Sequence, residues 1–354
     1  MRSRIFWLLL VVASVTFTSC GPEPPPEVIP PVNNGSDTTL VDVTELPPLR
    51  IPTDNPLSVA GVDLGRHLFY DDILSGDQSQ SCGTCHNQKH GFTDNGNALS
   101  EGVKGQLGTR NAMPTFNLMW GNGFFWDSRA TTLFHLATVP IENPIEMDAR
   151  VEDVLVRLNN STMYKDKFKK AFGVDTIKEE HLSKALEQFM LTITSDNSKF
   201  DKFNRGEANL TPQELRGFDV LKIKGCFNCH SSSLLTDNKS HNTALDKTPN
   251  DSGLMATTRR YEDRHKFKTP SLRNIMVTAP YMHDGRFETI EEVIEFYELV
   301  LPNLNLEMNR NASDSMRIAP RNRITPGEMA DVKAFLNTLT DHEMLNNPKF
   351  SDPF

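Results

Sequence analysis

The chain has 354 residues, of which 38% are hydrophobic and 23% are charged, and this length allows one large or two medium domains. Its 46 acidic residues outnumber its 37 basic residues, so the formal net charge of −9 excludes the basic face that nucleic-acid binding requires. The mean hydropathy is −0.43 and the one long apolar run stands at the extreme N-terminus, which excludes a polytopic membrane protein.

The first 20 residues have the layout of a secretion signal. Arg2 and Arg4 precede an apolar stretch at 5–15, which is too short for a comfortable membrane span, and the segment ends at Cys20. The following residues, 21–47, predict a proline-rich acidic linker. This layout resembles that of a bacterial lipoprotein, in which Cys20 is acylated and the linker is a tether. Ordinary cleavage nearby, with Cys20 lost or left free, is the alternative.

The other four cysteines form two motifs that indicate haem attachment. Each motif reads C-x-x-C-H, the signature of c-type haem: Cys82, Cys85 and His86 in the first, and Cys226, Cys229 and His230 in the second. The two thiols bond to the two vinyl groups of one haem, and the adjacent histidine binds the iron. Zinc would need four ligands per site, and a redox C-x-x-C has no need of the histidine. The sequence therefore predicts two covalent haems, and export as well, because c-type haem is attached outside the cytoplasm.

Helical spacing of apolar residues recurs along the chain. It precedes the first motif at 56–69 and the second at 211–221, where Thr211 and Glu214 form a capping box. The same spacing predicts helices at 151–158, 182–193 and 325–339, whereas no stretch shows sustained alternation. We expect an all-α protein with two cytochrome c-like domains, at 48–205 and 206–354, each binding one haem.

Six segments between about residues 55 and 340 carry a family resemblance. They are LGRHLF at 64–69, GTRN at 108–111, FWDSRA at 125–130, ENPIEM at 142–147, FKTPSLRN at 267–274 and TAPYMHDG at 278–285. In this order they resemble the bacterial di-haem cytochrome c peroxidase family, which includes the methylamine-utilisation enzymes that oxidise tryptophans of a partner protein.

The resemblance assigns roles around the N-terminal haem, which cleaves peroxide in this family. His86 would be its proximal ligand, and Glu146 would be the acid–base group that moves a proton between the peroxide oxygens. Trp126 matches a tryptophan that lies between the two haems and is suited to relay an electron. A solvated loop glutamate and a buried aromatic anchor are the respective alternatives for Glu146 and Trp126.

The sequence departs from the family pattern at two positions near this haem. Leu136 stands where members often have a glutamine, and an apolar residue cannot orient peroxide. Val103 stands where many peroxidases have a histidine that covers the resting iron, and valine cannot bind iron. We therefore expect an open iron at rest, as in the methylamine-utilisation branch.

The resemblance also supplies ligands in the C-terminal half. His230 would be the proximal ligand of the second haem, and Tyr297 stands where many peroxidases have the methionine on the other side. A phenolate stabilises higher iron oxidation states, whereas methionine raises the potential. A core tyrosine, with Met282 or Met308 as ligand, is the alternative.

A calcium site completes what the resemblance implies. Asn111, Thr278 and Pro280 match a calcium site at the domain interface, and oxygen donors suit this hard cation. Routine turn geometry around Pro280 is the alternative.

Together these features predict an exported, lipid-anchored periplasmic enzyme that reduces hydrogen peroxide with electrons from a small donor protein, a cytochrome or a cupredoxin. One alternative is an oxidase that modifies a protein or organic substrate, which Tyr297 and Val103 favour. Another is an electron carrier, which applies if Glu146 does not face an open iron. The family's habit of dimerising makes a homodimer compatible with the sequence.

Overall fold

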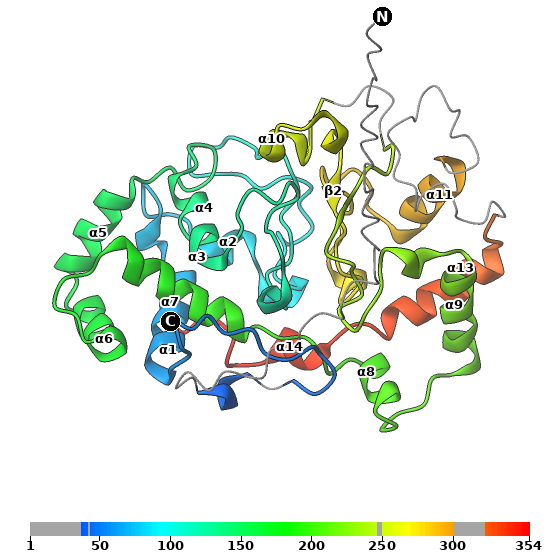
Figure 1. The fold of residues 1–354 in the computed structure, drawn as a ribbon, viewed down its shortest axis with the longest axis horizontal. Coiled ribbons are helices and arrows are strands. Elements are labelled where there is room, and N and C mark those ends of the chain that lie inside the picture. Colours follow the sequence, from blue (N-terminus) through cyan, green and yellow to red (C-terminus); the bar gives the residue numbers. More distant parts are fainter. Residues whose placement is uncertain (1–36, 42, 246–249, 301–322) are drawn as a thin grey trace, which may run out of the picture. The chain divides into compact units, whose positions relative to one another are not determined.

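The computed structural model of the chain describes residues 37–41, 43–245, 250–300 and 323–354 (Figure 1). The predicted signal with Cys20, most of the predicted linker, and Met308 lie outside these ranges. Within them, no helix combines the length and the apolar character that crossing a membrane needs.

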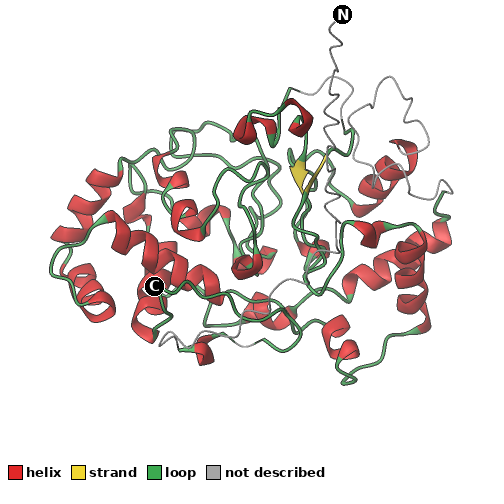
Figure 2. Ribbon diagram, in the orientation of Figure 1, coloured by secondary structure: helices red, strands yellow, loops and turns green. Residues whose placement is uncertain are grey.

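The fold is predominantly helical, as predicted, with short helices joined by long loops (Figure 2). In chain order the α-helices and strands are α1 (Val59–Tyr70), α2 (Cys82–Cys85), α3 (Leu133–Leu136), α4 (Val139–Glu142), α5 (Val151–Asn160), α6 (Thr162–Phe172), α7 (Glu179–Thr192), α8 (Lys199–Asn204), α9 (Pro212–Ile223), β1 (Ser240–His241), α10 (Met255–Thr258), β2 (Phe267–Lys268), α11 (Ile290–Val300), α13 (Pro326–Asn337) and α14 (His342–Asn346). The 3₁₀ turns are η1 (Thr38–Leu40), η2 (Asp72–Leu74), η3 (Gln88–His90), η4 (Leu118–Trp120), η5 (Cys226–Asn228), η6 (Tyr261–Asp263) and η7 (Ile275–Val277).

The capping signals read from the sequence are present as side-chain hydrogen bonds. Thr211 and Thr325 each accept a hydrogen bond from the main-chain N–H three residues on, and α9 and α13 each begin with proline. Ser58 caps α1 in the same way, through the N–H of Gly61. Among the described residues, the one sheet that departs from an all-α fold is the antiparallel pair of two-residue strands β1 and β2. Strands this short show too few residues for apolar alternation to predict them.

The helix that precedes each haem motif crosses a partner helix at a glycine. A β-carbon on Gly65 of α1 would lie 1.9 Å from the carbonyl oxygen of Ala185 in α7. A β-carbon on Gly217 of α9 would lie 2.0 Å from the carbonyl oxygen of Asp331 in α13. Figure 1 shows α9 and α13 side by side. The internal repeat that the sequence predicts therefore extends to the way each pair of helices packs.

Buried apolar residues form two clusters that correspond broadly to the two predicted halves. The first includes Leu64 and Phe189 from α1 and α7, and the second includes Val220 and Phe335 from α9 and α13. The division at residues 205 and 206 stays a prediction, because residues 33–354 form one compact unit.

The structure differs from the predicted boundaries at both ends of the chain. Residues that we expected in the linker pack on the first half: Val41 is buried, and the main-chain N–H of Thr44 donates to Asp196. The C-terminal tail returns to the first half as well, where Tyr70 donates its hydroxyl hydrogen to the carbonyl of Phe350 and Met344 joins the first cluster. Neither contact has a local sequence signal, because both join segments far apart in the chain.

We predict that Gly217→Ala lowers the free energy of unfolding by about 1–3 kcal/mol, the usual cost of overpacking against a rigid neighbour. The clash with main-chain atoms outweighs the gain of about 1 kcal/mol in helix propensity. Thermal unfolding of the variant measures the loss. Gly327→Ala in α13 is the matched control, because its β-carbon would meet nothing within 4 Å. Equal melting temperatures for the two variants would contradict the close helix crossing.

Candidate haem sites

The first motif forms the short helix α2, and its glycine has a packing role. A β-carbon on Gly83 would lie 2.4 Å from the ring of Tyr70, the last residue of α1. The small residue between Cys82 and Cys85 therefore lets the motif approach the preceding helix. Ser81 and Thr84 close a capping box around α2.

Each motif histidine makes the same hydrogen bond. The Nδ1 atom of His86 donates to the carbonyl of Phe92 over 2.9 Å, and the Nδ1 atom of His230 donates to the carbonyl of Pro270 over 3.0 Å. This bond fixes the ring orientation and leaves Nε2 to bind a metal. Burial lowers the pKa of both imidazoles, which favours the neutral form that binds iron.

The two cysteines of each motif have the spacing that attachment to a single haem requires. Burial raises the pKa of the Cys82 thiol to about 12 and that of the Cys226 thiol to about 11. A geometric cluster of Cys229, Asp237 and His241 has the residue types of a metal site. Because Cys229 belongs to the second haem motif, we assign it to haem attachment.

The second motif opens into a cavity lined mainly by apolar side chains. Tyr297 of α11 lines it together with Cys226, Cys229 and His230. Burial raises the pKa of the Tyr297 phenol, and the two thiols raise it further. A phenolate ligand there would need the charge of a metal ion to displace its proton. Met282 lines the same cavity, so the structure leaves both side chains within reach of the site.

Trp126 connects the two halves. It is buried, lines the cavity of the second motif, and donates its indole N–H to the carbonyl of Asn111 over 2.9 Å. The neighbouring residue, Asp127, forms an ion pair with Arg110 at 2.7 Å. Arg110 also forms a bidentate ion pair with Asp251 of the C-terminal half. Trp126 is therefore held rigidly at the junction of the two halves.

Glu146 lies in the surroundings of the first motif. It is half-buried, and its charge acts on the thiols of Cys82 and Cys85. Burial raises the pKa of Glu146, whereas the hydrogen bond that Asn143 donates over 2.6 Å and the nearby charge of Arg129 lower it. Asn143 was not among the residues singled out from the sequence, although its place three residues before Glu146 is a signal for such a bond.

One of the two departures from the family pattern, Val103, lies next to Glu146. The main-chain N–H of Val103 donates to the carbonyl of Glu146 over 2.9 Å, so the segment that carries this valine packs directly on the glutamate. Leu136 ends the short helix α3, where the adjacent His135 is exposed and does not replace the missing glutamine.

The three predicted calcium ligands line the same cavity as Trp126. The side-chain nitrogen of Asn111 donates to the carbonyls of Asn97 and Ala98, which orients its side-chain oxygen away from those groups. The hydroxyl of Thr278 donates to the carbonyl of Ile275. Asn111, Thr278 and Pro280 are thus all among the residues that line this one large cavity.

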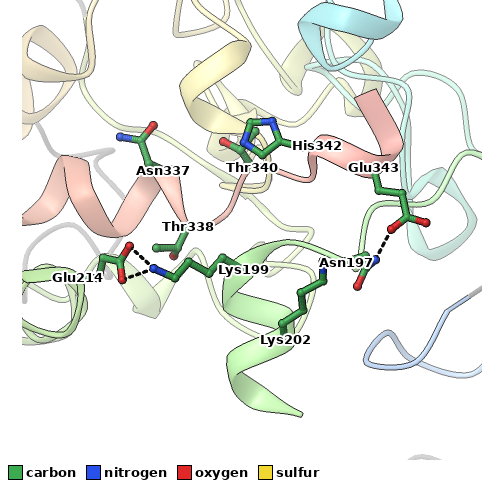
Figure 3. A pocket seen from close by; sticks show the side chains of 9 residues that line it. All are labelled: Asn197, Lys199, Lys202, Glu214, Asn337, Thr338, Thr340, His342 and Glu343. Atoms are coloured by element: carbon green, nitrogen blue, oxygen red, sulfur yellow. Dashed lines mark hydrogen bonds and ion pairs between the residues drawn. The ribbon is translucent and has the colours of Figure 1, made fainter. Parts of the chain in front are cut away.

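A second pocket, shown in Figure 3, contains none of the predicted site residues. Its charged groups largely satisfy one another: Lys199 pairs with Glu214, and Asn197 donates to Glu343. The pocket is lined by Asn197, Lys199, Lys202, Glu214, Asn337, Thr338, Thr340, His342 and Glu343.

The fold and the paired motifs define a c-type cytochrome with two haem sites. The family described as di-haem cytochrome c peroxidase matches residues 59–209. Cytochrome c551 peroxidase from Nitrosomonas europaea is 35% identical over 298 residues, which are 83% of each chain. Methylamine utilization protein MauG from Methylorubrum extorquens is 36% identical over 296 residues, which are 81% of this chain and 80% of that one.

The solved structures agree with these sequence relatives. A MauG-like protein associated with microbial copper homeostasis is 34% identical, with a TM-score of 0.79 over 88% of this chain and 98% of that one. The di-haem peroxidase BthA from Burkholderia thailandensis is 22% identical with a TM-score of 0.71 over 84% of this chain and 91% of that one, which shows a common fold. The chain belongs to the di-haem cytochrome c peroxidase family of oxidoreductases, and this family carries two c-type haems.

If Tyr297 is the second ligand of the C-terminal haem, we predict that Tyr297→Phe changes the spectrum of that haem and leaves the N-terminal haem spectrum unchanged, because only the C-terminal haem would lose an oxygen ligand. Low-temperature electron paramagnetic resonance of the ferric protein measures both signals at once. Met282→Leu is the matched control and should alter neither. A changed signal in Met282→Leu with none in Tyr297→Phe would assign the ligand to the methionine.

Proposed function

We propose that the protein reduces hydrogen peroxide to water with electrons from a small redox protein. The reaction consumes one peroxide, two protons and two electrons, breaks the O–O bond and releases two waters. A c-type haem with a free coordination position supplies the site at which peroxide is reduced. The placement of Glu146 beside the first motif is the observation that carries the proposal, because this step needs a proton carrier next to the peroxide.

Glu146 has the properties that this proton transfer requires. As a carboxylate it can take the proton from the near oxygen of peroxide, and as a carboxylic acid it can give that proton to the far oxygen. Burial raises the pKa of Glu146, which favours the protonated form more than in an exposed glutamate. Asn143 acts on this balance by donating to the charged form.

Trp126 is suited to carry electrons between the two sites. Its indole belongs to the N-terminal half but lines the cavity of the second motif. We propose that electrons from a cytochrome or cupredoxin enter at the C-terminal haem, with His230 and Tyr297 as its iron ligands, and pass through Trp126 towards His86.

A second candidate is an oxidase that modifies a protein or organic substrate. Tyr297 in the cavity of the second motif and Leu136 in place of glutamine favour it. The rate at which the protein oxidises reduced cytochrome c in the presence of peroxide decides between these functions. A peroxidase takes its electrons from the cytochrome, whereas the oxidase would take them from the substrate that it modifies. A protein that accepts electrons but leaves peroxide intact would be an electron carrier.

We also propose that the protein is exported and anchored by a lipid on Cys20. The support is the signal-like segment 1–20 and the need to attach c-type haem outside the cytoplasm. Mass spectrometry of the mature N-terminus tests the anchor, which an unmodified Cys20 would exclude. A homodimer is compatible with this arrangement, and light scattering measures it.

We predict that Glu146→Gln keeps both haems and lowers the rate of peroxide cleavage by about 10²–10⁴-fold, the usual contribution of an acid–base group. Stopped-flow mixing with peroxide measures this rate. An unchanged rate would remove Glu146 from the mechanism.

Asn143→Ala provides a graded control for this role. Loss of its hydrogen bond should raise the pKa of Glu146, because the charged form loses its donor. Activity that needs the carboxylate falls as pH drops through this pKa, so the acid limb of the pH–rate profile should move to higher pH. A limb at the original pH would mean that another group controls it.

We predict that the oxidised protein reacts with peroxide without prior reduction. Val103 offers no lone pair to the iron, and its main chain is bonded to Glu146. The resting ferric protein should then show a high-spin haem signal. Two low-spin haems that react only after one-electron reduction would mean that a distant histidine covers the iron.

We propose that one calcium ion binds the oxygen atoms of Asn111, Thr278 and Pro280, whose common place in the cavity supports the site. Removal by a chelator should change the haem spectra and the activity, and added calcium should restore both. Elemental analysis of the purified protein measures the ion, and its absence from a fully active preparation would rule the site out.

A further inference from the structure

Lys268 of β2 is a buried lysine at the junction of the two halves. The residue is among those that line the cavity of the second motif, and it is only 9% exposed. Its main-chain N–H donates to the carbonyl of Trp126 over 2.9 Å. The residue that carries the ammonium group is therefore hydrogen-bonded, through its main chain, to Trp126, the proposed electron relay.

The hydrogen-bond partners of this ammonium group are all neutral. Nζ donates to the side-chain oxygen of Asn238 over 2.8 Å, to that of Asn122 over 3.2 Å, and to the carbonyl of Asn238 over 3.4 Å. Among the residues that the structure describes, no carboxylate forms an ion pair with it. The acidic residue whose charge acts on it is Asp237, and that carboxylate is already bonded to His241 over 2.7 Å.

A buried charge without a counter-charge is costly, and proteins normally pair such a group. Desolvation accordingly lowers the pKa of Lys268 to about 8. The haem predicted for this cavity carries two propionate carboxylates, which would supply the missing negative charge. An alkyl residue of similar length could fill the same space at lower cost, so packing alone does not explain a lysine here.

We infer that Lys268 provides the positive charge that binds a propionate carboxylate of the C-terminal haem, beside Trp126. This inference rests on the haem attachment at Cys226 and Cys229. It makes Lys268 a positioning residue: it orients the edge of the cofactor towards the relay and stabilises the reduced haem relative to the oxidised haem by its charge.

The test uses the holoprotein and begins with its haem content. Lys268→Met removes the charge and keeps the length of the side chain, and Lys268→Arg keeps the charge. Lys239→Met is the matched control, because Lys239 is exposed and lies in the segment next to Asn238. Spectroelectrochemical titration gives the midpoint potential of each haem, and the propionate-bending band in resonance Raman spectra reports the hydrogen bonds of the propionates.

We expect Lys268→Met to lower the midpoint potential of the C-terminal haem and to shift its propionate band. Lys268→Arg should retain the potential and still shift the band, and Lys239→Met should change neither. If the Lys268→Met variant does not fold, the propionate band of the Lys268→Arg variant tests the inference by itself.

The inference would be wrong if Lys268→Met left both the midpoint potential and the propionate band unchanged, or if Lys268→Arg left the propionate band unchanged. Lys268 would then have only a structural role, as a residue that links the two halves. Asn122→Ala would then lower the melting temperature as much as Lys268→Met does. Loss of the C-terminal haem from the unsubstituted protein would overturn the cofactor assignment and this inference together. Peroxidase activity enters none of these measurements, so they fail independently of the proposed reaction.

Discussion

The hydrogen bond from each motif histidine to a main-chain carbonyl is the constraint on which both sites depend. A c-type haem is attached by its edge to flexible cysteine side chains, so the orientation of the imidazole must be fixed by something else. His86 uses the carbonyl of Phe92 and His230 uses that of Pro270. The segments that present these two carbonyls are therefore part of each site.

The second constraint is the junction between the halves. Trp126 is held by Asn111 through its ring and by Lys268 through its main chain, while its neighbour Asp127 pairs with Arg110. Polar groups at this junction form hydrogen bonds and ion pairs across the two halves. The free-energy cost of burying them is therefore lower than it would be without partners. The proposed electron transfer through Trp126 would need the two sites at a fixed separation, and these hydrogen bonds and ion pairs join the two halves on either side of that residue.

Much of the fold and part of the site could be predicted because the signals are local. The helices before each motif, the capping boxes at Thr211 and Thr325, and the C-x-x-C-H motifs all depend on residues a few positions apart. The contacts of Thr44 and of Phe350 could not be predicted, because they join the chain ends to residues more than a hundred positions away. Asn143 stood close enough to Glu146 to be predicted, and its role becomes evident only from the bond between them.

The sequence by itself determined the chemistry: which cysteines and histidines attach haem, and which side chains stand where the family has its ligands. Residue identity decides this, because only these atoms can bond to a vinyl group or an iron. The tertiary structure decided which groups share an environment, since burial and long-range contacts have no signature in local spacing. It brought Tyr297 and Met282 to one cavity, and it left the ammonium group of Lys268 buried among neutral amides beside Trp126.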